Sequence, residues 1–202
     1  MTALPRFYPV FDSAAWVERA VRARVRMVQI RLKDPDEARL WPEIRDARDI
    51  ARVSGAILVV NDHWRLAIDL GCDWLHLGQE DLDTADLPAI RRAGLRLGIS
   101  THDEAELDRA LSVGPDYLAL GPVYPTILKE MPWAPQGLDR LGAWKRRVGT
   151  IPLVAIGGMT VERAPGAFGA GADIVSAVTD ITLNTDPDAR PAPWPLPIQT
   201  LS

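Results

Sequence analysis

MVQIRLK (27–33) and the two runs that follow it, ILVVND (57–62) and WLHLG (74–78), decide the fold. They are short, nearly continuous apolar stretches, and segments with helical spacing lie between them at 35–54 and 64–70. Strands of this kind are typical of parallel sheets that helices cover on both faces. The sequence therefore predicts an α/β fold of repeated strand–helix units.

The same alternation continues outward from this stretch in both directions. Five further strand-like runs are FYPVFD (7–12), LRLGIS (95–100), YLALGPV (117–123), PLVAIGG (152–158) and DIVSAV (173–178). Helical or turn-bounded segments lie at 13–24, 84–93, 103–113, 137–147 and 160–171. Eight strand–helix units favour a closed (β/α)8 TIM-type barrel. An open doubly wound sheet is the alternative, although no GxGxxG motif follows the first strand.

Length and composition predict one domain with an unusual tail. The chain has 202 residues, of which 47% are hydrophobic, enough for one core. We expect a barrel over residues 1–180 and a proline-rich tail over 181–202. Its prolines oppose helix, so the eighth helix should be missing or short, with an extended tail that uses Trp194 to cover the gap. A disordered tail is the alternative.

Charge and cysteine content narrow the possible partners. The formal net charge is -4 without a basic block, which argues against nucleic acid. No apolar run of about 20 residues and no signal-peptide pattern is visible, which argues against a membrane. The single cysteine, Cys72, fits a reducing cytoplasm. We expect a cytoplasmic protein that acts on small molecules, and the pattern leaves a homo-oligomer open.

Barrels of this type carry their active sites at the carboxyl ends of the strands. Gln29, Arg31 and Lys33 alternate along the second strand and therefore share one face. If that face points inward, its cations call for an anionic ligand or for carboxylate partners. A strand end that is merely solvated is the alternative.

Acidic residues follow the next two strands. Asn61-Asp62 ends one strand, and Gln79-Glu80-Asp81 follows the other. Two carboxylates that converge require a proton or a cation between them, and oxygen ligands beside a phosphate substrate suit Mg²⁺. Alternatively, Asp62 caps the helix that begins near His63, and Asp81 is an ordinary surface acid.

The last strands offer phosphate-binding features. Gly157-Gly158 ends the seventh strand and Val178-Thr179 the eighth, the pair of strands after which barrels commonly bind phosphate. The long connection at 121–137 is typical of a lid or binding loop, in which Thr126 and Lys129 can bind phosphate. Ser100 contributes a hydroxyl at the end of the fifth strand. No histidine stands in a metal-binding or catalytic spacing, and we assign none to catalysis.

Taken in order, these motifs resemble one family. QIRLK (29–33), VVND (59–62), HLGQED (76–81), LGIS (97–100), GPVYPT (121–126) with Lys129, AIGGMT (155–160) and GADIVSAV (171–178) are similar to thiamine phosphate synthase over residues 27–180. The related thiazole tautomerases share the barrel and the Gly-Gly strand, but their pattern lacks the paired acids.

The resemblance implies a Mg²⁺-dependent transferase that joins hydroxymethylpyrimidine diphosphate to a thiazole phosphate and releases pyrophosphate. Its implied metal ligands are Asp62 and Asp81. Diphosphate binding is implied for Arg31, Lys33, Asn61, Thr126 and Lys129, pyrimidine contacts for Gln29 and Ser100, and thiazole phosphate contacts for Gly158, Val178 and Thr179. Arg31, Ser100 and Lys129 are the residues it would make catalytic.

Two departures from the family pattern stand out. Leu128 replaces the threonine that the family has before its loop lysine, and Thr179 replaces a serine. The first removes a diphosphate contact, whereas the second keeps a hydroxyl. A thiazole tautomerase-like enzyme and a barrel that only binds a phosphorylated ligand are the alternatives.

Overall fold

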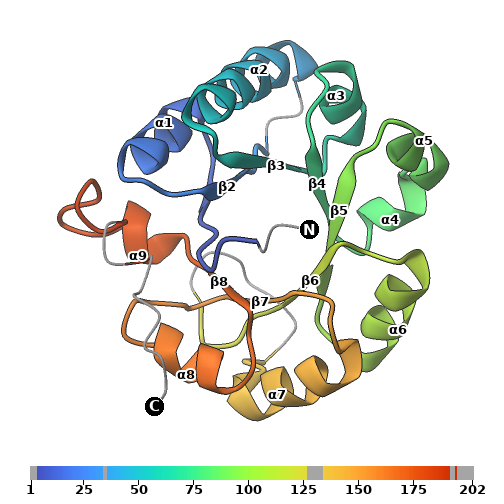
Figure 1. The fold of residues 1–202 in the computed structure, drawn as a ribbon, viewed down its shortest axis with the longest axis vertical. Helices are drawn as coiled ribbons and strands as arrows, with labels where there is room; N and C mark the ends of the chain where they lie inside the picture. Colours follow the sequence, from blue (N-terminus) through green and yellow to red (C-terminus); the bar gives the residue numbers. More distant parts are fainter. Residues whose placement is uncertain (1–3, 34–35, 127–133, 192–193, 195–202) are drawn as a thin grey trace.

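The computed structural model describes residues 4–33, 36–126, 134–191 and 194. Eight parallel strands form one ring in the order in which they follow along the chain (Figure 1). They are β1 (Val10–Phe11), β2 (Met27–Ile30), β3 (Ile57–Asn61), β4 (Trp74–Leu77), β5 (Arg96–Thr101), β6 (Tyr117–Leu120), β7 (Leu153–Ile156) and β8 (Ile174–Ser176). The predicted TIM-type barrel is confirmed, because a doubly wound sheet would reverse its strand order midway.

The ring closes where β8 meets the segment that leads into β1. Phe7 pairs with Val175 as a parallel bridge. The N–H groups of Tyr8 and Val10 donate to the carbonyl oxygens of Val175 and Ala177 at 3.0 and 3.1 Å. These bonds pair the last strand along its outer side, as closure of a barrel requires.

Helices cover the outside of the ring (Figure 1). They are α1 (Ala14–Arg22), α2 (Glu37–Ser54), α3 (Trp64–Asp69), α4 (Asp81–Thr84), α5 (Leu87–Arg92), α6 (Glu104–Val113), α7 (Gly137–Val148), α8 (Ala164–Gly169) and α9 (Thr179–Thr182). Polar residues begin several of them: Ser13, Asp36, Asp86 and Asp103 each accept a hydrogen bond from a first-turn N–H. None of the described helices is both long enough and apolar enough to cross a membrane.

Inward-facing side chains change character along the barrel axis. Near the amino ends of the strands they are large and apolar, and form one cluster that includes Met27, Val59, Trp74, Tyr117 and Val154. Two residues further along the same faces stand Gln29, Asn61 and His76, all buried. The interior is therefore an apolar plug at one end and a polar surface at the other.

Gly98 makes room for the largest of these side chains. A Cβ built at Gly98 would lie 2.0 Å from the ring of Tyr117, which pairs with it across β5 and β6. Because this position carries no side chain, the phenol ring can extend across the interior. Its hydroxyl thereby reaches the polar end.

The tail after β8 begins with α9, whose four residues confirm the predicted short eighth helix. Trp194 is buried, stacks on Phe7 with centroids 4.4 Å apart, and donates from Nε1 to Asp180 at 3.0 Å. Residues 183–191 form turns rather than the extended path that the prolines predict, because Asp186 caps one of them by accepting from the Ala189 N–H. The domain division at residue 180 stays a prediction.

Candidate active site

Two carboxylates meet at the carboxyl ends of β3 and β4. Asp62 follows β3 with φ 64°, and its N–H donates to the carbonyl oxygen of His76 at 2.9 Å. Asp81 begins α4 and accepts from the N–H of Gly78 at 3.1 Å. Burial, followed by the charge of Asp81 and a hydrogen bond to it, raises the pKa of Asp62 to about 7, whereas Arg31 acts in the opposite direction. The pair is thus close enough to share a proton or a cation.

The alternative, in which Asp62 caps a helix and Asp81 is an ordinary surface acid, is not supported by their positions. Residue 63, not Asp62, is the N-cap of α3, and no side chain caps that helix. Glu80 is exposed, but Asp81 is only partly so. Within the described ranges, no group of three or more His, Cys, Asp or Glu side chains could hold a metal ion. A cation held here would keep further ligand positions for water or substrate.

Gln29 in β2 and the two cations that follow this strand differ in depth. Gln29 is buried in the barrel, and Arg31 is partly buried near enough to Asp62 and His76 to influence the pKa of both. Lys33 is exposed and lines a cavity of about 540 Å³ between β2 and the start of α2. The expectation of a shared inward face therefore holds for Gln29, while Lys33 lies at the rim.

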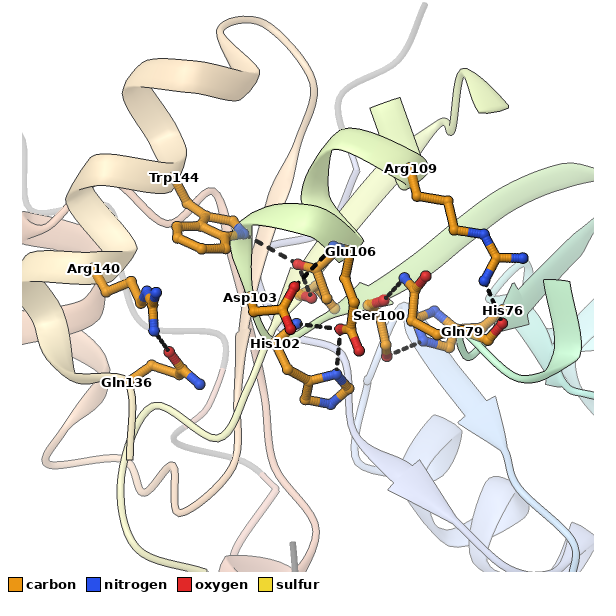
Figure 2. Close-up of polar contacts among 12 residues, drawn as sticks. His76, Gln79, Ser100, His102, Asp103, Glu106, Arg109, Gln136, Arg140 and Trp144 are labelled. Carbon is orange, nitrogen blue, oxygen red and sulfur yellow. Dashed lines mark hydrogen bonds and ion pairs between the residues drawn. The ribbon is translucent and has the colours of Figure 1, made fainter. Parts of the chain in front are cut away.

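Ser100, at the end of β5, lies beside His76 and Gln79 (Figure 2). Its Oγ is 2.7 Å from Nε2 of His76, and its carbonyl oxygen accepts from Nε2 of Gln79, also at 2.7 Å. Arg109 in turn donates to the carbonyl oxygen of Gln79 at 3.0 Å. These bonds fix the position of Ser100, with its hydroxyl at the polar end of the interior.

His76 is the functional candidate that sequence reasoning missed. It is buried, with Nδ1 2.8 Å from the hydroxyl of Tyr117. Burial, with a smaller effect of Arg31, lowers its pKa to about 3, so the ring is neutral. In β4 it occupies one of the alternate positions whose side chains point into the barrel, and it lies in register with Asn61 on β3. This position is the signal that could have identified it. The other two histidines make local contacts, His63 with the Leu32 carbonyl and His102 with Glu106.

The glycine pair after β7 fits tightly beneath the connection that follows β6. Gly157 and Gly158 have φ 90° and 62°, and a Cβ on Gly158 would lie 2.4 Å from the carbonyl oxygen of Pro125. A larger residue is therefore excluded at this position. In the part of the chain that the structure describes, the N–H groups of Gly158, Val178 and Thr179 donate to no other backbone group. A phosphate bound at these strand ends could accept from them.

The tail holds the chain just after Thr179. Asp180 accepts from Arg190 at 2.7 and 2.8 Å, in addition to the bond from Trp194. Only 7% of the Asp180 side chain is exposed. This contact between α9 and the later part of the tail was not predicted.

The connection after β6 is described only in part. Thr126 is partly exposed at the end of its described portion. Lys129 and Leu128 lie outside the described residues, as does the middle of the predicted lid, residues 127–133. Their assigned roles stay predictions.

Fold and site together define a class of protein: a TIM-type barrel whose polar site lies at the carboxyl ends of its strands, where such enzymes carry their active sites. Comparison with known proteins supplies the family. Residues 7–181 match the family model for thiamine monophosphate synthase, and the chain belongs to this family.

Relatives from several organisms agree with that assignment. A thiamine-phosphate synthase from Rhizobium etli is 60% identical over 191 residues, covering 95% of this chain and 94% of its own. One from Cronobacter sakazakii is 51% identical and covers 89% and 85%. Among solved structures, a thiamine phosphate pyrophosphorylase from Pyrococcus furiosus superposes with a TM-score of 0.82 at 25% identity, covering 93% and 92%.

Proposed function

We propose that this enzyme joins hydroxymethylpyrimidine diphosphate to a thiazole phosphate, giving thiamine phosphate and pyrophosphate. The observation that carries the proposal is the Asp62–Asp81 pair with Arg31 beside it, at the mouth of a barrel whose interior is lined with neutral polar groups. A diphosphate leaving group needs positive charge, and a neutral heterocycle needs hydrogen bonds without charge. The two kinds of environment lie side by side.

Mg²⁺ is the cofactor that we propose for the carboxylate pair. Asp62 and Asp81 supply only oxygen ligands, and burial together with the charge of Asp81 raises the pKa of Asp62, so a divalent cation between the two carboxylates would favour their charged forms. When bound, the ion would neutralise charge on the diphosphate oxygens. Burial of Asp62 favours this chemistry, because each charge interaction is stronger away from water.

The diphosphate end draws on groups from β2, β3 and the β6 connection. Arg31 and Lys33 supply cations at the mouth. Asn61 offers a buried amide nitrogen, Nδ2, that has no hydrogen-bond partner among the described groups. Thr126, in the connection after β6, is a further diphosphate contact that we propose. Lys129 is included because of its position in the family motif. Together these residues hold a polyanion while the carbon–oxygen bond to it breaks.

The pyrimidine and the thiazole phosphate would likewise be bound by separate groups of residues. Gln29 and Ser100 line the interior where the pyrimidine would sit, and the N–H groups at Gly158, Val178 and Thr179, which donate to no described backbone group, would receive the thiazole phosphate. As diphosphate leaves with the bonding electron pair, the aminopyrimidine stabilises the cationic methylene carbon, which the thiazole nitrogen then attacks. No protein nucleophile is required, and positioning with electrostatic stabilisation accounts for the role of every residue named.

One assay tests this proposal. The purified protein is mixed with both phosphorylated substrates, with Mg²⁺ or with a chelator, and thiamine phosphate is measured. We expect product only with the metal. Conversion of the thiazole phosphate alone, independent of metal, would instead establish a tautomerase, and ligand binding without turnover would establish a binding protein.

The proposed cytoplasmic location rests on the lone Cys72, whose pKa burial raises to about 11.

A further inference from the structure

Five side chains form a continuous hydrogen-bonded chain through the barrel. Gln29 donates from Nε2 to the hydroxyl of Tyr8. The hydroxyls of Tyr8 and Tyr117 are 2.8 Å apart, and the Tyr117 hydroxyl is 2.8 Å from Nδ1 of His76. Nε2 of His76 then meets Oγ of Ser100 at 2.7 Å. The chain therefore begins at an amide and ends at a hydroxyl in the site.

The number of protons in this chain gives it a direction. An amide nitrogen can only donate, a phenol has one proton to give, and a neutral imidazole has one N–H. Tyr8 accepts from Gln29, and its other described partner is the Tyr117 hydroxyl, so its own proton goes to Tyr117, whose proton goes to Nδ1 of His76. The ring proton must then be on Nε2, from which it is donated to Ser100. Every member is satisfied in this order.

Burial keeps the proton count constant. It raises the pKa of Tyr8 and of Tyr117, which remain neutral phenols. In this order the Tyr117 hydroxyl already donates to Nδ1 of His76, so a second ring proton on Nδ1 would face the Tyr117 proton. The chain has no charged state that could reverse it.

We propose that this chain fixes the Ser100 hydroxyl as a hydrogen-bond donor toward the ligand, so that its three inner members act as positioning residues. Oγ of Ser100 already accepts from His76, and its own proton is not used by the chain. Among the described contacts Oγ has no partner besides His76, which leaves that proton for the partly exposed mouth of the barrel.

The consequence is a rule of selection for the ligand. A Ser100 hydroxyl that donates can bind a ring nitrogen with a free lone pair. It cannot bind a ring N–H at the same place, because both groups would be donors. Resting on the proposed function, this means that Ser100 reads a ring nitrogen of the pyrimidine rather than its amino group. A chain running in the opposite direction would make Ser100 an acceptor and select the amino group instead.

The tautomer of His76 tests the direction without any substrate. In the ¹⁵N-labelled free protein, long-range proton–nitrogen correlations distinguish Nε2–H from Nδ1–H, and His76→Gln identifies the signals by their loss. We expect Nε2–H as the single form. A predominant Nδ1–H form would overturn the proposal. Because no turnover is involved, failure of the proposed function would leave this result unaffected.

Variants then test whether Gln29 sets the direction. Tyr8→Phe separates Gln29 from Tyr117, and Gln29→Met removes the donor itself with little change in volume. Either should give a mixture of His76 tautomers, and a single unchanged tautomer in both would overturn the role of Gln29. Tyr124→Phe is the matched control, since Tyr124 lies outside the chain. A mixture in the control would show that the tautomer responds to any lost phenol and would also count against the proposal.

Substrate analogues test the selection rule. Two analogues of the pyrimidine diphosphate are compared, each with a different ring nitrogen replaced by C–H, and binding is measured directly. The wild-type protein should bind one of them about two- to tenfold more weakly than the other, the range expected for one neutral hydrogen bond. Ser100→Ala should abolish this difference and Tyr117→Phe should reduce it. Full discrimination in Ser100→Ala would refute the assignment.

Discussion

The two ends of the barrel interior are built by the same strands and follow opposite rules. At the amino ends, Met27, Val59 and Trp74 are packed and apolar. At the carboxyl ends, Asn61 Nδ2, Gln79 Oε1 and Ser176 Oγ are buried polar atoms with no hydrogen-bond partner among the described groups. Unpaired groups of this kind cost free energy. The comparison shows one end that stabilises the fold and another that retains polar groups for a ligand.

The largest effect is expected from substitutions at the polar end, which should lower the catalytic activity. Asp62→Asn or Asp81→Asn should lower turnover by roughly a thousandfold, comparable to the loss of a major electrostatic group. Steady-state assays with Mg²⁺ measure it. Asp69→Asn, an exposed acid on α3, is the matched control and should retain activity. Normal Mg²⁺-dependent rates in both site variants would exclude the two-carboxylate site.

Loss of the tail should have the next largest effect, on stability. Truncation after Asp186 removes Trp194 from its stack on Phe7 and Arg190 from Asp180. Removal of a buried tryptophan costs about 3 kcal/mol or more. Urea titration of the truncated and intact proteins measures the difference. An unchanged midpoint would show that these contacts add nothing to the barrel.

At the apolar end, Met27→Ala should lower the free energy of unfolding by about 2 kcal/mol, because it leaves a cavity in the packed plug. The rate constant of the enzyme that remains folded should be nearly unchanged. Chemical denaturation and kcat measured on the same samples test both statements. A large fall in kcat with little loss of stability would mean that the two ends are not separate in function.

The dependence of stability on pH should reveal the cost of the polar end. Since the pKa of Asp62 is raised from 3.8 to about 7, the folded protein keeps a proton that the unfolded chain releases above pH 4. Without divalent cations, stability should therefore fall as pH rises from about 4 to 7, by on the order of 1 kcal/mol after solvent screening.

Asp62→Asn provides the comparison for this pH effect. It should be more stable than the wild type at pH 8 and nearly equal at pH 4, as melting temperatures in a chelator would show. Mg²⁺ should stabilise the wild type alone. A variant that is less stable at pH 8 would contradict the sign of the effect.

The smallest effect is expected at the rim. Lys33→Ala should weaken binding of the pyrimidine diphosphate about two- to tenfold, because the exposed cation acts through solvent. Affinity for the thiazole phosphate should not change. Titration calorimetry with each ligand, using Arg92→Ala on α5 as a control, measures both. An equal loss for the two ligands would contradict the separation of a diphosphate end from a phosphate end.

The sequence alone predicted the barrel because apolar runs and turn residues recur at the spacing of strand–helix units. It also predicted which side chains stand at strand ends, since Asp62 and Asp81 follow recognisable strands directly. The depth of each group could not be read from the sequence. Lys33 and Gln29 share a parity on β2, yet one is exposed and the other is enclosed.

What escaped prediction depends on contacts across the ring. His76 resembles a packed residue in an apolar strand until the register of β4 with β5 brings Ser100 beside it. Tyr117 reaches the same place only because Gly98 leaves space on the neighbouring strand. The bond from Arg190 to Asp180 likewise joins the later part of the tail to α9, and no local pattern relates the two.

The stack of Phe7 on Trp194 has a consequence for synthesis of the protein in the cell. One partner is made at the start of the described chain and the other at its end, and the bridge between Phe7 and Val175 also joins early residues to late ones. While the ribosome is still translating the intervening strands, the first of them has no neighbour on its outer side. An incomplete sheet of this kind exposes a strand edge that can pair with other chains. The sheet can close only after β8 has been translated, and the stack of Phe7 on Trp194 forms later still, so a nascent chain stalled before Val175 should be a substrate for chaperones.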